Sequence, residues 1–363
     1  MGTKYLVDGD DLTTIANHIR TKGGTSAALS FPSGFSDAID DIESGGTDLM
    51  AEIYKHDGIS KLLVDVSADE AANFYFKGDT SANRNLTIDW GDGSAYEYTD
   101  KDTAFSGYFS HAYAKAGTYL IRIWETEPYS GDQTKAFFPY LQFGRDRDNK
   151  DGYVALRAIA YGSVAYVYSN SYIRPSGRDD ITDAVITMTD FVTGNFRITF
   201  QSCGALRRVK FMVDDPTVTF QLPSYLFNGC SQLIDVDLPD NVPYLDYYCF
   251  ANCYSLRSIT LPSTITSIKL NCFANCRALQ EIDIPSAVTT IESSAFSSCL
   301  SLEKLIIRNT NAVVTASGDL FAGSTIASGT GYIYVPDALV DSYKEATNWS
   351  TYSAQIKGLS ELE

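Results

Sequence analysis

The sequence lacks long apolar runs, clusters of basic residues and any excess of positive charge. Nowhere do about 18 consecutive apolar residues occur, and residues 1–11 contain no apolar core of a secretion signal. We therefore expect neither insertion into a membrane nor Sec export. The net charge is −17 and no Lys/Arg cluster interrupts it. Such a chain repels a phosphate backbone, so we expect no nucleic-acid partner.

Histidine is scarce, and the usual signatures of nucleophilic catalysis are missing. The three histidines, His18, His56 and His111, lie in separate segments, and the chain contains neither a Gly-x-Ser-x-Gly motif nor a phosphate-cradling loop. A catalytic triad needs its members within hydrogen-bond reach of one another. The sequence therefore predicts no nucleophilic triad.

The sequence does contain enough apolar material for several domains. The chain has 363 residues, of which 44% are hydrophobic and 20% charged. This is a globular composition, long enough for roughly two or three folded units. Aromatic residues make up 13%, with 24 Tyr. Exposed tyrosine suits stacking on sugar rings or anchoring a protein interface, and buried β-structure uses tyrosine equally well, so both interpretations stay open.

The second half of the chain contains a 23-residue repeat. Four units align on Phe-x-x-Cys, beginning at Phe227, Phe250, Phe273 and Phe296. Each Cys is followed by Leu-x-x-(Val/Ile/Leu)-x-(Leu/Ile), whose last two apolar positions alternate as in a short strand. In three units a Pro then ends the strand, and a second apolar pair precedes the next Phe. Each unit is too small to bury these residues alone, so the units must stack as coils of a solenoid.

The seven cysteines follow the repeat rather than a disulfide pattern. Five of them close a Phe-x-x-Cys motif, Cys203 in a less regular first unit, and Cys249 and Cys272 stand one residue before a Phe. An odd number in phase with the repeat predicts small buried residues and folding in a reducing cytoplasm. The Cys-x-x-x-Cys pairs at 249/253 and 272/276 offer a metal-binding alternative. No histidine lies in this region, so we predict no metal site.

The repeat resembles the BspA-like leucine-rich repeats, a family found in bacterial and protozoal surface adhesins and in phage-encoded proteins. The resemblance covers roughly residues 200–335, with an irregular first unit at Phe200, and predicts a solenoid domain over residues 200–331. Residues 332–363, which include an amphipathic stretch at 337–346, would form a C-terminal cap. The resemblance implies binding through a repetitive surface rather than a reaction.

Residues 1–46 predict a short helical hairpin, because two segments carry apolar residues at helical spacing. The candidate docking positions are Leu12, Ile15, Ile19, Phe31, Phe35 and Ile39. Two such short helices cannot bury a stable core alone and need a partner. The segment resembles the N-terminal part of tail proteins from phages and prophages. This resemblance implies docking to other virion proteins or homo-oligomerisation; a hairpin packed on the next domain is the alternative.

Residues 50–128 predict a small β-sandwich. Strand-like stretches separated by Gly, Asp and Asn occur at 62–66, 73–77, 86–90 and 119–124. The run Asp89-Trp-Gly-Asp92-Gly, followed by Tyr113, resembles the polycystic-kidney-disease (PKD) type of immunoglobulin-like domain. In that family the motif forms a tight hairpin and the tyrosine lies in the core. The resemblance implies turn-forming roles for Asp89 and Asp92, with a bound Ca²⁺ as the alternative and no other cofactor.

Residues 129–199 carry no regular repeat and predict an irregular β region or atypical first coils. The loop at 146–152 is as acidic as a calcium loop. Its Gly falls at the seventh position where an EF-hand needs the sixth, and Arg157 replaces the required Glu, so a solvated turn is predicted. Taken together, the segments predict a mainly β, multidomain protein.

Glycan hydrolysis is the enzymatic alternative, since it needs two suitably spaced carboxylates. Asp237 and Asp283 occupy outward strand positions two coils apart, in a row that also contains Lys210, Thr260 and Ile306. At about 4.8 Å per coil their separation is about 9.6 Å, the outer edge of the inverting range. An open repeat face offers no deep pocket that excludes water. We therefore predict no catalytic residues.

The leading hypothesis is a phage virion component, at the tail tip or in a tail appendage, that recognises a glycan or protein on the host surface. The predicted ligand-binding positions are the outward strand residues Asp235, Asp237, Arg257, Thr260, Glu281, Asp283 and Lys304. The alternatives are a BspA-like cell-surface adhesin and a virion decoration without a receptor role. An adhesin must be exported, whereas a virion protein assembles in the host cytoplasm.

Overall fold

The computed structural model describes residues 49–55, 59–66, 72–80, 86–98, 105–125, 154–164, 181–188, 199–213, 217, 219 and 221–362. The chain divides into two units, Met1–Lys55 and His56–Glu363. The first is described only around helix α3 (Leu49–Ile53). The predicted hairpin at 1–46 and the acidic loop at 146–152 lie outside the described residues. Within them, no helix has the length and apolar character needed to cross a membrane.

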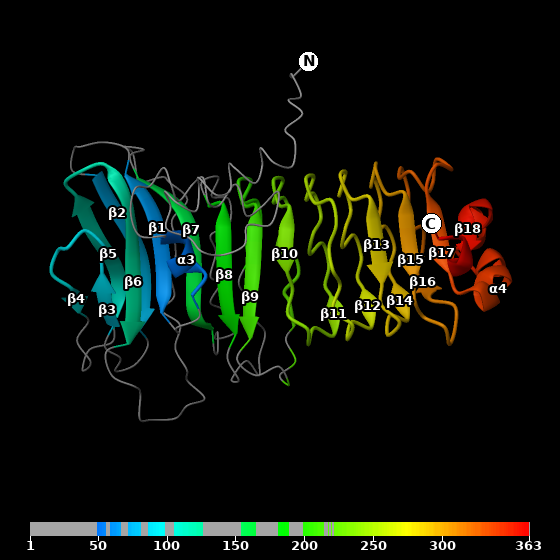
Figure 1. Ribbon diagram of the computed structural model, residues 1–363, viewed down its shortest axis with the longest axis horizontal. Helices are drawn as coiled ribbons and strands as arrows, with labels where there is room; N and C mark the ends of the chain where they lie inside the picture. Colours follow the sequence, from blue (N-terminus) through cyan, green and yellow to red (C-terminus); the bar gives the residue numbers. More distant parts are fainter. Residues whose placement is uncertain are drawn as a thin grey trace, which may run out of the picture. The chain divides into compact units, whose positions relative to one another are not determined.

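The second unit is mainly β, as the sequence predicts, and one eight-stranded sheet links its N-terminal strands to the repeats. The strands of this sheet are β1 (Ser60–Val66), β3 (Leu86–Asp89), β4 (Glu97–Tyr98), β6 (Gly117–Glu125), β7 (Val154–Val164), β8 (Asp183–Met188), β9 (Arg208–Val213) and β10 (Asp235–Asp237). Their order is β10-β9-β8-β7-β1-β6-β3-β4 (Figure 1). β1 pairs antiparallel with β6 and β7, whereas β7, β8, β9 and β10 pair parallel. The parallel ladder therefore begins before the first Phe-x-x-Cys unit.

A two-stranded sheet accompanies the N-terminal strands. It consists of β2 (Ala72–Thr80) and β5 (Phe105–Tyr113), which pair antiparallel. Phe109 and Tyr113 of β5 are buried, and the Tyr113 hydroxyl donates to the carbonyl oxygen of Trp90 at 3.0 Å. The four strand-like stretches that the sequence indicates lie within β1, β2 and β6 and across β3. The PKD-type assignment and the domain boundaries stay predictions.

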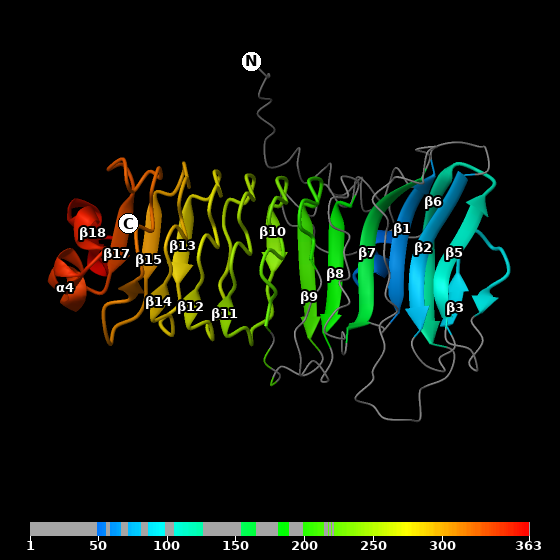
Figure 2. The same ribbon diagram turned by 180° about the vertical axis from the view of Figure 1, so that it is seen from behind.

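The repeats form coils that succeed one another side by side (Figures 1 and 2). Two four-stranded parallel sheets follow the eight-stranded one. The first contains β11 (Tyr244–Leu245), β12 (Ser267–Ile268), β14 (Thr290–Ile291) and β16 (Thr315–Ala316). The second contains β13 (Glu281–Ile284), β15 (Lys304–Ile307), β17 (Tyr332–Val335) and β18 (Ile356–Gly358). The 23-residue period is visible in the register, which places Ser267 beside Thr290. The predicted solenoid is confirmed.

The phenylalanines of the motif stack through the core. The rings of Phe250 and Phe273 lie 5.3 Å apart with an interplanar angle of 3°, and those of Phe227 and Phe250 are also 5.3 Å apart. The apolar pairs before each Phe are buried as predicted: Val242 and Leu245, Ile265 and Ile268, Val288 and Ile291. Because burying one such side chain contributes about 1.5–3 kcal/mol, this regular stack is the main stabilising feature of the coils.

The Phe-x-x-Cys turn needs a left-handed backbone at its third residue. Asn252 and Asn275 have φ 62° there, and Gly229 has φ 81°. Asparagine tolerates this region better than most residues. Its side chain also links coils, because Asn252 Nδ2 donates to Asn228 Oδ1 at 2.9 Å and Asn275 Nδ2 to Asn252 Oδ1 at 3.1 Å. The sequence of the turn thus satisfies both backbone shape and stacking.

The C-terminal residues close the last coil. The stretch predicted to be helical contains η2 (Asp337–Leu339) and α4 (Val340–Glu345), followed by η3 (Ser350–Gln355) and η4 (Leu359–Glu361). The Trp349 indole donates to the Val314 carbonyl oxygen at 2.7 Å, and the Val314 amide donates to the Tyr343 hydroxyl at 2.9 Å. The cap thus satisfies backbone groups that a further coil would otherwise pair.

One outward position differs from the expectation. Ile306 stands in the predicted outward row but is only 2% exposed. It lies in register with Tyr334 of β17, which is also buried. Because neighbouring strands are about 4.8 Å apart, this large side chain shields the isoleucine from solvent. The outward row is therefore solvent-accessible only before the capped end.

Candidate ligand-binding faces

Six of the seven predicted ligand-binding residues recur at the 23-residue period on a side of the coils that we call the strand face, and Arg257 is one residue out of this phase. Asp235 and Asp237 are exposed on β10, and Glu281 and Asp283 are exposed on β13. Lys304 is half-buried on β15. Arg257 and Thr260 are exposed in the coil between these strands, which is not paired as a strand. Their role in ligand binding stays a prediction.

Opposite charges alternate across the strand face. The register places Asp235 beside Arg208 and Asp237 beside Lys210. Further along, Glu281 lies beside Lys304. In-register side chains on one face are close enough to interact, and opposite charges there are mildly stabilising. The face therefore presents alternating charges rather than a field of one sign.

Asp283 forms an ion pair with Arg308, which the repeat pattern did not predict. Arg308 Nε donates to Asp283 Oδ1 at 2.9 Å, and Arg308 Nη2 donates to Asp283 Oδ2 at 2.7 Å. This bidentate contact raises the pKa of Arg308 despite partial burial. Both carboxylate oxygens of Asp283 are thus held by a guanidinium. Asp283 is therefore arranged as a member of an ion pair rather than as a general acid that acts together with Asp237.

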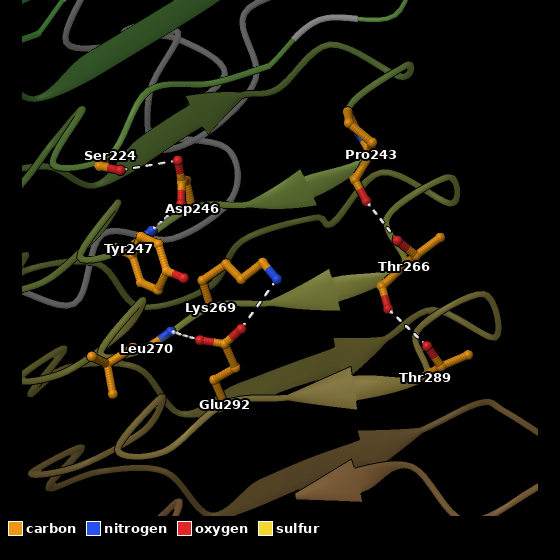
Figure 3. Close-up of polar contacts among 9 residues, drawn as sticks. All are labelled: Ser224, Pro243, Asp246, Tyr247, Thr266, Lys269, Leu270, Thr289 and Glu292. Carbon is orange, nitrogen blue, oxygen red and sulfur yellow. Dashed lines mark hydrogen bonds and ion pairs between the residues drawn. The ribbon is translucent and has the colours of Figure 1, made fainter. Parts of the chain in front are cut away.

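A second side of the solenoid, which we call the β11 face, carries β11, β12, β14 and β16 with the turn residues that follow them. Figure 3 shows Asp246, Lys269 and Glu292 at the carboxyl ends of successive strands. Lys269 Nζ lies 3.1 Å from Glu292 Oε1, and Glu292 Oε2 accepts from the Leu270 amide at 3.1 Å. Lys269 also lies over the Tyr244 ring, 5.5 Å from its centroid. This network satisfies the lysine charge locally.

The Asp89 and Asp92 carboxylates form turns, which confirms the role predicted for them. Asp89 Oδ1 accepts from the Gly91 amide at 2.9 Å and Asp92 Oδ1 from the Ser94 amide at 3.0 Å. Asp92 Oδ2 lies 2.7 Å from His111 Nε2. Burial raises the pKa of Asp92, but the hydrogen bonds from Ser94 and His111 outweigh it and lower the pKa to about 2. Protein donors therefore already bind these carboxylates.

All seven cysteines are buried thiols that form no disulfide. The thiols of the repeat donate to the phenylalanine carbonyl of the preceding coil, as Cys253 does to Phe227 at 3.3 Å. Burial raises the pKa of the Cys230, Cys253, Cys276 and Cys299 thiols, to about 12 for Cys299. Throughout the described part of the chain, no group of three or more His, Cys, Asp or Glu side chains is arranged to hold a metal ion. The cysteines have the packing role that their register predicts.

Three solved structures are similar to part of the chain. A leucine-rich repeat protein from Bacteroides ovatus is 20% identical, over 53% of this chain and 68% of its own, with a TM-score of 0.28. A leucine-rich repeat protein from T. pallidum is 21% identical, over 52% and 88%, with a TM-score of 0.28. A leucine-rich cell surface protein from Faecalibacterium prausnitzii is 19% identical, over 46% and 72%, with a TM-score of 0.21.

No curated protein matches the chain. The family model that matches is described as a BspA type leucine rich repeat region, and it recurs in six copies over residues 197–327. This agrees with the coils that begin at Phe200 and with the stacked phenylalanines up to Phe321. Residues 197–327 therefore consist of BspA-type leucine-rich repeats.

Proposed function

We propose that the protein is a non-enzymatic recognition protein that binds a ligand on a cell surface through the strand face of its repeats. The observation that carries this proposal is the placement of five exposed polar residues at two outward positions of consecutive coils. They are Asp235, Asp237, Thr260, Glu281 and Asp283, and Arg257 is exposed one residue out of phase with them. A rigid ladder of this kind loses little conformational freedom on binding, which favours recognition.

The geometry favours binding over glycan hydrolysis at the same residues. An inverting hydrolase needs one carboxyl group as a general acid and a second as a base. Asp283 instead accepts two hydrogen bonds from Arg308. The second carboxylate, Asp237, lies two coils away and is exposed on β10. A general acid usually needs burial to raise its pKa, so Asp237 is poorly suited to that role.

At a finer level, we propose a virion component at the tail tip or in a tail appendage, assembled in the host cytoplasm. Residues 1–46 would dock to other virion proteins or to further copies of the chain. Support comes from the tail-protein resemblance of that segment and from the apolar positions it carries. The second candidate is a BspA-like cell-surface adhesin, which the repeats favour equally. A virion decoration without a receptor role is the third.

The recognition proposal is tested by measuring binding of the full-length chain to permissive host cells. A triple variant, Asp237→Ala, Arg257→Ala and Glu281→Ala, should retain its fold and lose binding, since all three side chains are exposed. The matched control is Ser263→Ala with Ser286→Ala, which alters exposed residues outside the strand face. Unchanged binding of the triple variant would show that the binding site lies outside the strand face.

The virion assignment has its own test. Mass spectrometry of purified particles should detect this polypeptide at a stoichiometry that matches a tail component. Its absence from particles, or a gene neighbourhood without tail genes, would sink the virion assignment and favour the adhesin. Binding to no permissive cell, with the polypeptide present in the particle, would favour decoration.

A further inference from the structure

Three tyrosines meet at one turn of the β11 face. We use the name tyrosine turn for Ser224, Tyr225, Asp246, Tyr247 and Tyr248. Two neighbouring coils contribute to it, and the Tyr225 amide donates to the Tyr247 carbonyl oxygen at 2.9 Å. The rings of Tyr225 and Tyr248 stack with centroids 4.9 Å apart and an interplanar angle of 5°. Tyr225 is 40% exposed and Tyr247 43%, so aromatic surface faces solvent here.

The fold of the turn does not require tyrosine. Tyr225 has φ 62° and Tyr248 has φ 55°, both in the left-handed region. The following coils place Asn271 and Ser294 at the same position, with φ 55° and 58°. A bulky side chain is unusual in this region and carries a conformational cost, whereas asparagine tolerates it. The two tyrosines therefore need another explanation than the shape of the turn.

A fixed hydrogen-bond acceptor lies beside the rings. Asp246 Oδ1 accepts from the Tyr247 amide at 2.8 Å, and Asp246 Oδ2 accepts from the Ser224 hydroxyl at 2.9 Å (Figure 3). An ionised carboxylate has about four lone-pair sites, so each oxygen can accept once more. The carboxylate is thus held in one orientation while it retains capacity for a ligand hydroxyl.

The charge around the tyrosine turn selects against acidic ligands. The lysine that follows β12, Lys269, is paired with Glu292 at 3.1 Å. Asp246 contributes a negative charge, and the whole chain carries −17. A sialylated, sulfated or phosphorylated group would therefore be repelled. A neutral ligand that carries hydroxyl groups meets no such penalty.

We propose that the tyrosine turn binds a neutral oligosaccharide. The exposed aromatic surface of Tyr225 and Tyr247 would pack against the apolar C–H face of a sugar ring, and Asp246 with Ser224 would bind its hydroxyls. The backbone ladder that links the coils holds these groups in place before binding. This site lies on the β11 face, apart from the strand face of the proposed function, and is independent of it.

The test uses purified full-length protein and four neutral hexasaccharide probes, built from glucose, galactose, mannose and N-acetylglucosamine. Titration by saturation-transfer NMR should show binding of at least one. Tyr247→Ala should weaken it about tenfold or more, since truncating an aromatic anchor removes most of its contact. Tyr254→Ala is the matched control: this tyrosine is also 40% exposed but follows Cys253, beyond the Phe-x-x-Cys turn.

A second variant separates binding from folding. Tyr225→Asn introduces asparagine, which Asn271 shows to be compatible with the left-handed turn. The variant should therefore keep or raise the thermal midpoint of unfolding and no longer bind the oligosaccharide. Binding of none of the four probes overturns the inference, as does an equal loss in Tyr254→Ala. A preference for sialylated glycans, or cell binding that survives enzymatic removal of glycans, also overturns it. A protein that binds cells but no neutral sugar leaves the strand-face proposal standing.

Discussion

The Cys276 thiol donates a hydrogen bond to the Phe250 carbonyl oxygen across the coil boundary, at 3.2 Å. The same contact joins Cys230 to Phe200 and Cys299 to Phe273. The carbonyl also accepts from an amide of its own coil, since the Cys253 amide donates to Phe250 at 3.2 Å. The cysteine is thus both a small apolar filler and a weak donor to a buried acceptor.

We expect Cys276→Ala to lower the free energy of unfolding by about 1–2 kcal/mol. The change removes a buried sulfur and its hydrogen bond and leaves a small cavity. Urea unfolding followed by circular dichroism measures this loss. The control is Ser286→Ala at an exposed position, which should stay within about 0.5 kcal/mol of the parent. Equal stability of the two variants would show that the thiol ladder contributes nothing.

The buried thiols also predict an alkaline loss of stability. Burial raises the pKa of Cys299 from 9.0 to about 12, and the other repeat thiols shift in the same direction. The unfolded chain therefore releases these protons first as pH rises from 9, while the folded chain keeps them. The stabilisation is complete below about pH 9 and falls as pH rises towards 12, by about 1.4 kcal/mol per pH unit for each thiol.

Urea midpoints at about pH 8 and about pH 10.5 test this dependence. The midpoint should fall at the higher pH. Cys299→Ala should show a smaller fall than the parent, because it removes one of the thiols whose pKa differs between the two states. Identical slopes for parent and variant would mean that Cys299 ionises in the folded protein as readily as in the unfolded chain.

The repeat period predicted the coils because each coil reuses the same buried positions. Phe250 and Phe273 occupy equivalent sites, so their spacing alone fixed the stack that the structure shows. The repeat period could not predict that Arg308 binds Asp283. That pair is separated by 25 residues, two more than the period, and alignment by equivalent position compares only residues 23 apart. Diagonal contacts depend on side-chain length and direction, which a period does not contain.

The sequence also left open where the parallel pairing starts, since residues 129–199 could be an irregular β region or atypical first coils. β7 and β8 pair in parallel register and continue into β9, yet their segment has no Phe-x-x-Cys motif. Parallel pairing joins residues far apart in the chain and is recognised by pattern only where the pattern repeats. The tyrosine turn was missed for a related reason. The sequence feature that could have indicated it is a tyrosine two residues before the Phe in two successive units, at 225 and 248.

Two arginine–aspartate pairs should differ sharply in their effect on stability. Arg208 Nε lies 2.6 Å from Asp183 Oδ1, and the Asp183 side chain is 3% exposed. In the Arg308 and Asp283 pair the side chains are 43% and 49% exposed. Arg208→Ala removes a cation from beside a buried carboxylate and should cost about 3 kcal/mol. Arg308→Ala should cost less than about 1 kcal/mol, because solvent screens the pair.

Chemical denaturation of both variants at low and high salt measures this contrast. The small effect of Arg308→Ala should vanish at high salt, since exposed pairs are screened, while that of Arg208→Ala should persist. Equal losses for the two variants would contradict the assignment of Asp183 as the buried partner.

Removal of residues 1–198 should make the solenoid self-associate. β8 covers one edge of β9 along its whole length, with Asp183 beside Arg208 and Met188 beside Val213. The truncation exposes that edge, and an uncovered parallel strand with free N–H and C=O groups is a template for pairing with another chain. It also removes the aspartate that pairs with Arg208. Light scattering after size-exclusion chromatography should therefore show oligomers or aggregates of residues 199–363.

The matched control is the unit His56–Glu363, which keeps β1, β7 and β8 in the shared sheet and should elute as a smaller species. A monomeric 199–363 fragment with the thermal midpoint of the longer unit would show that the N-terminal strands do not protect the ladder. If the fragment associates as expected, cell-binding measurements on isolated repeats would report contacts of an edge that the intact chain covers. Binding to host cells and to oligosaccharides must then be compared on chains that retain β8.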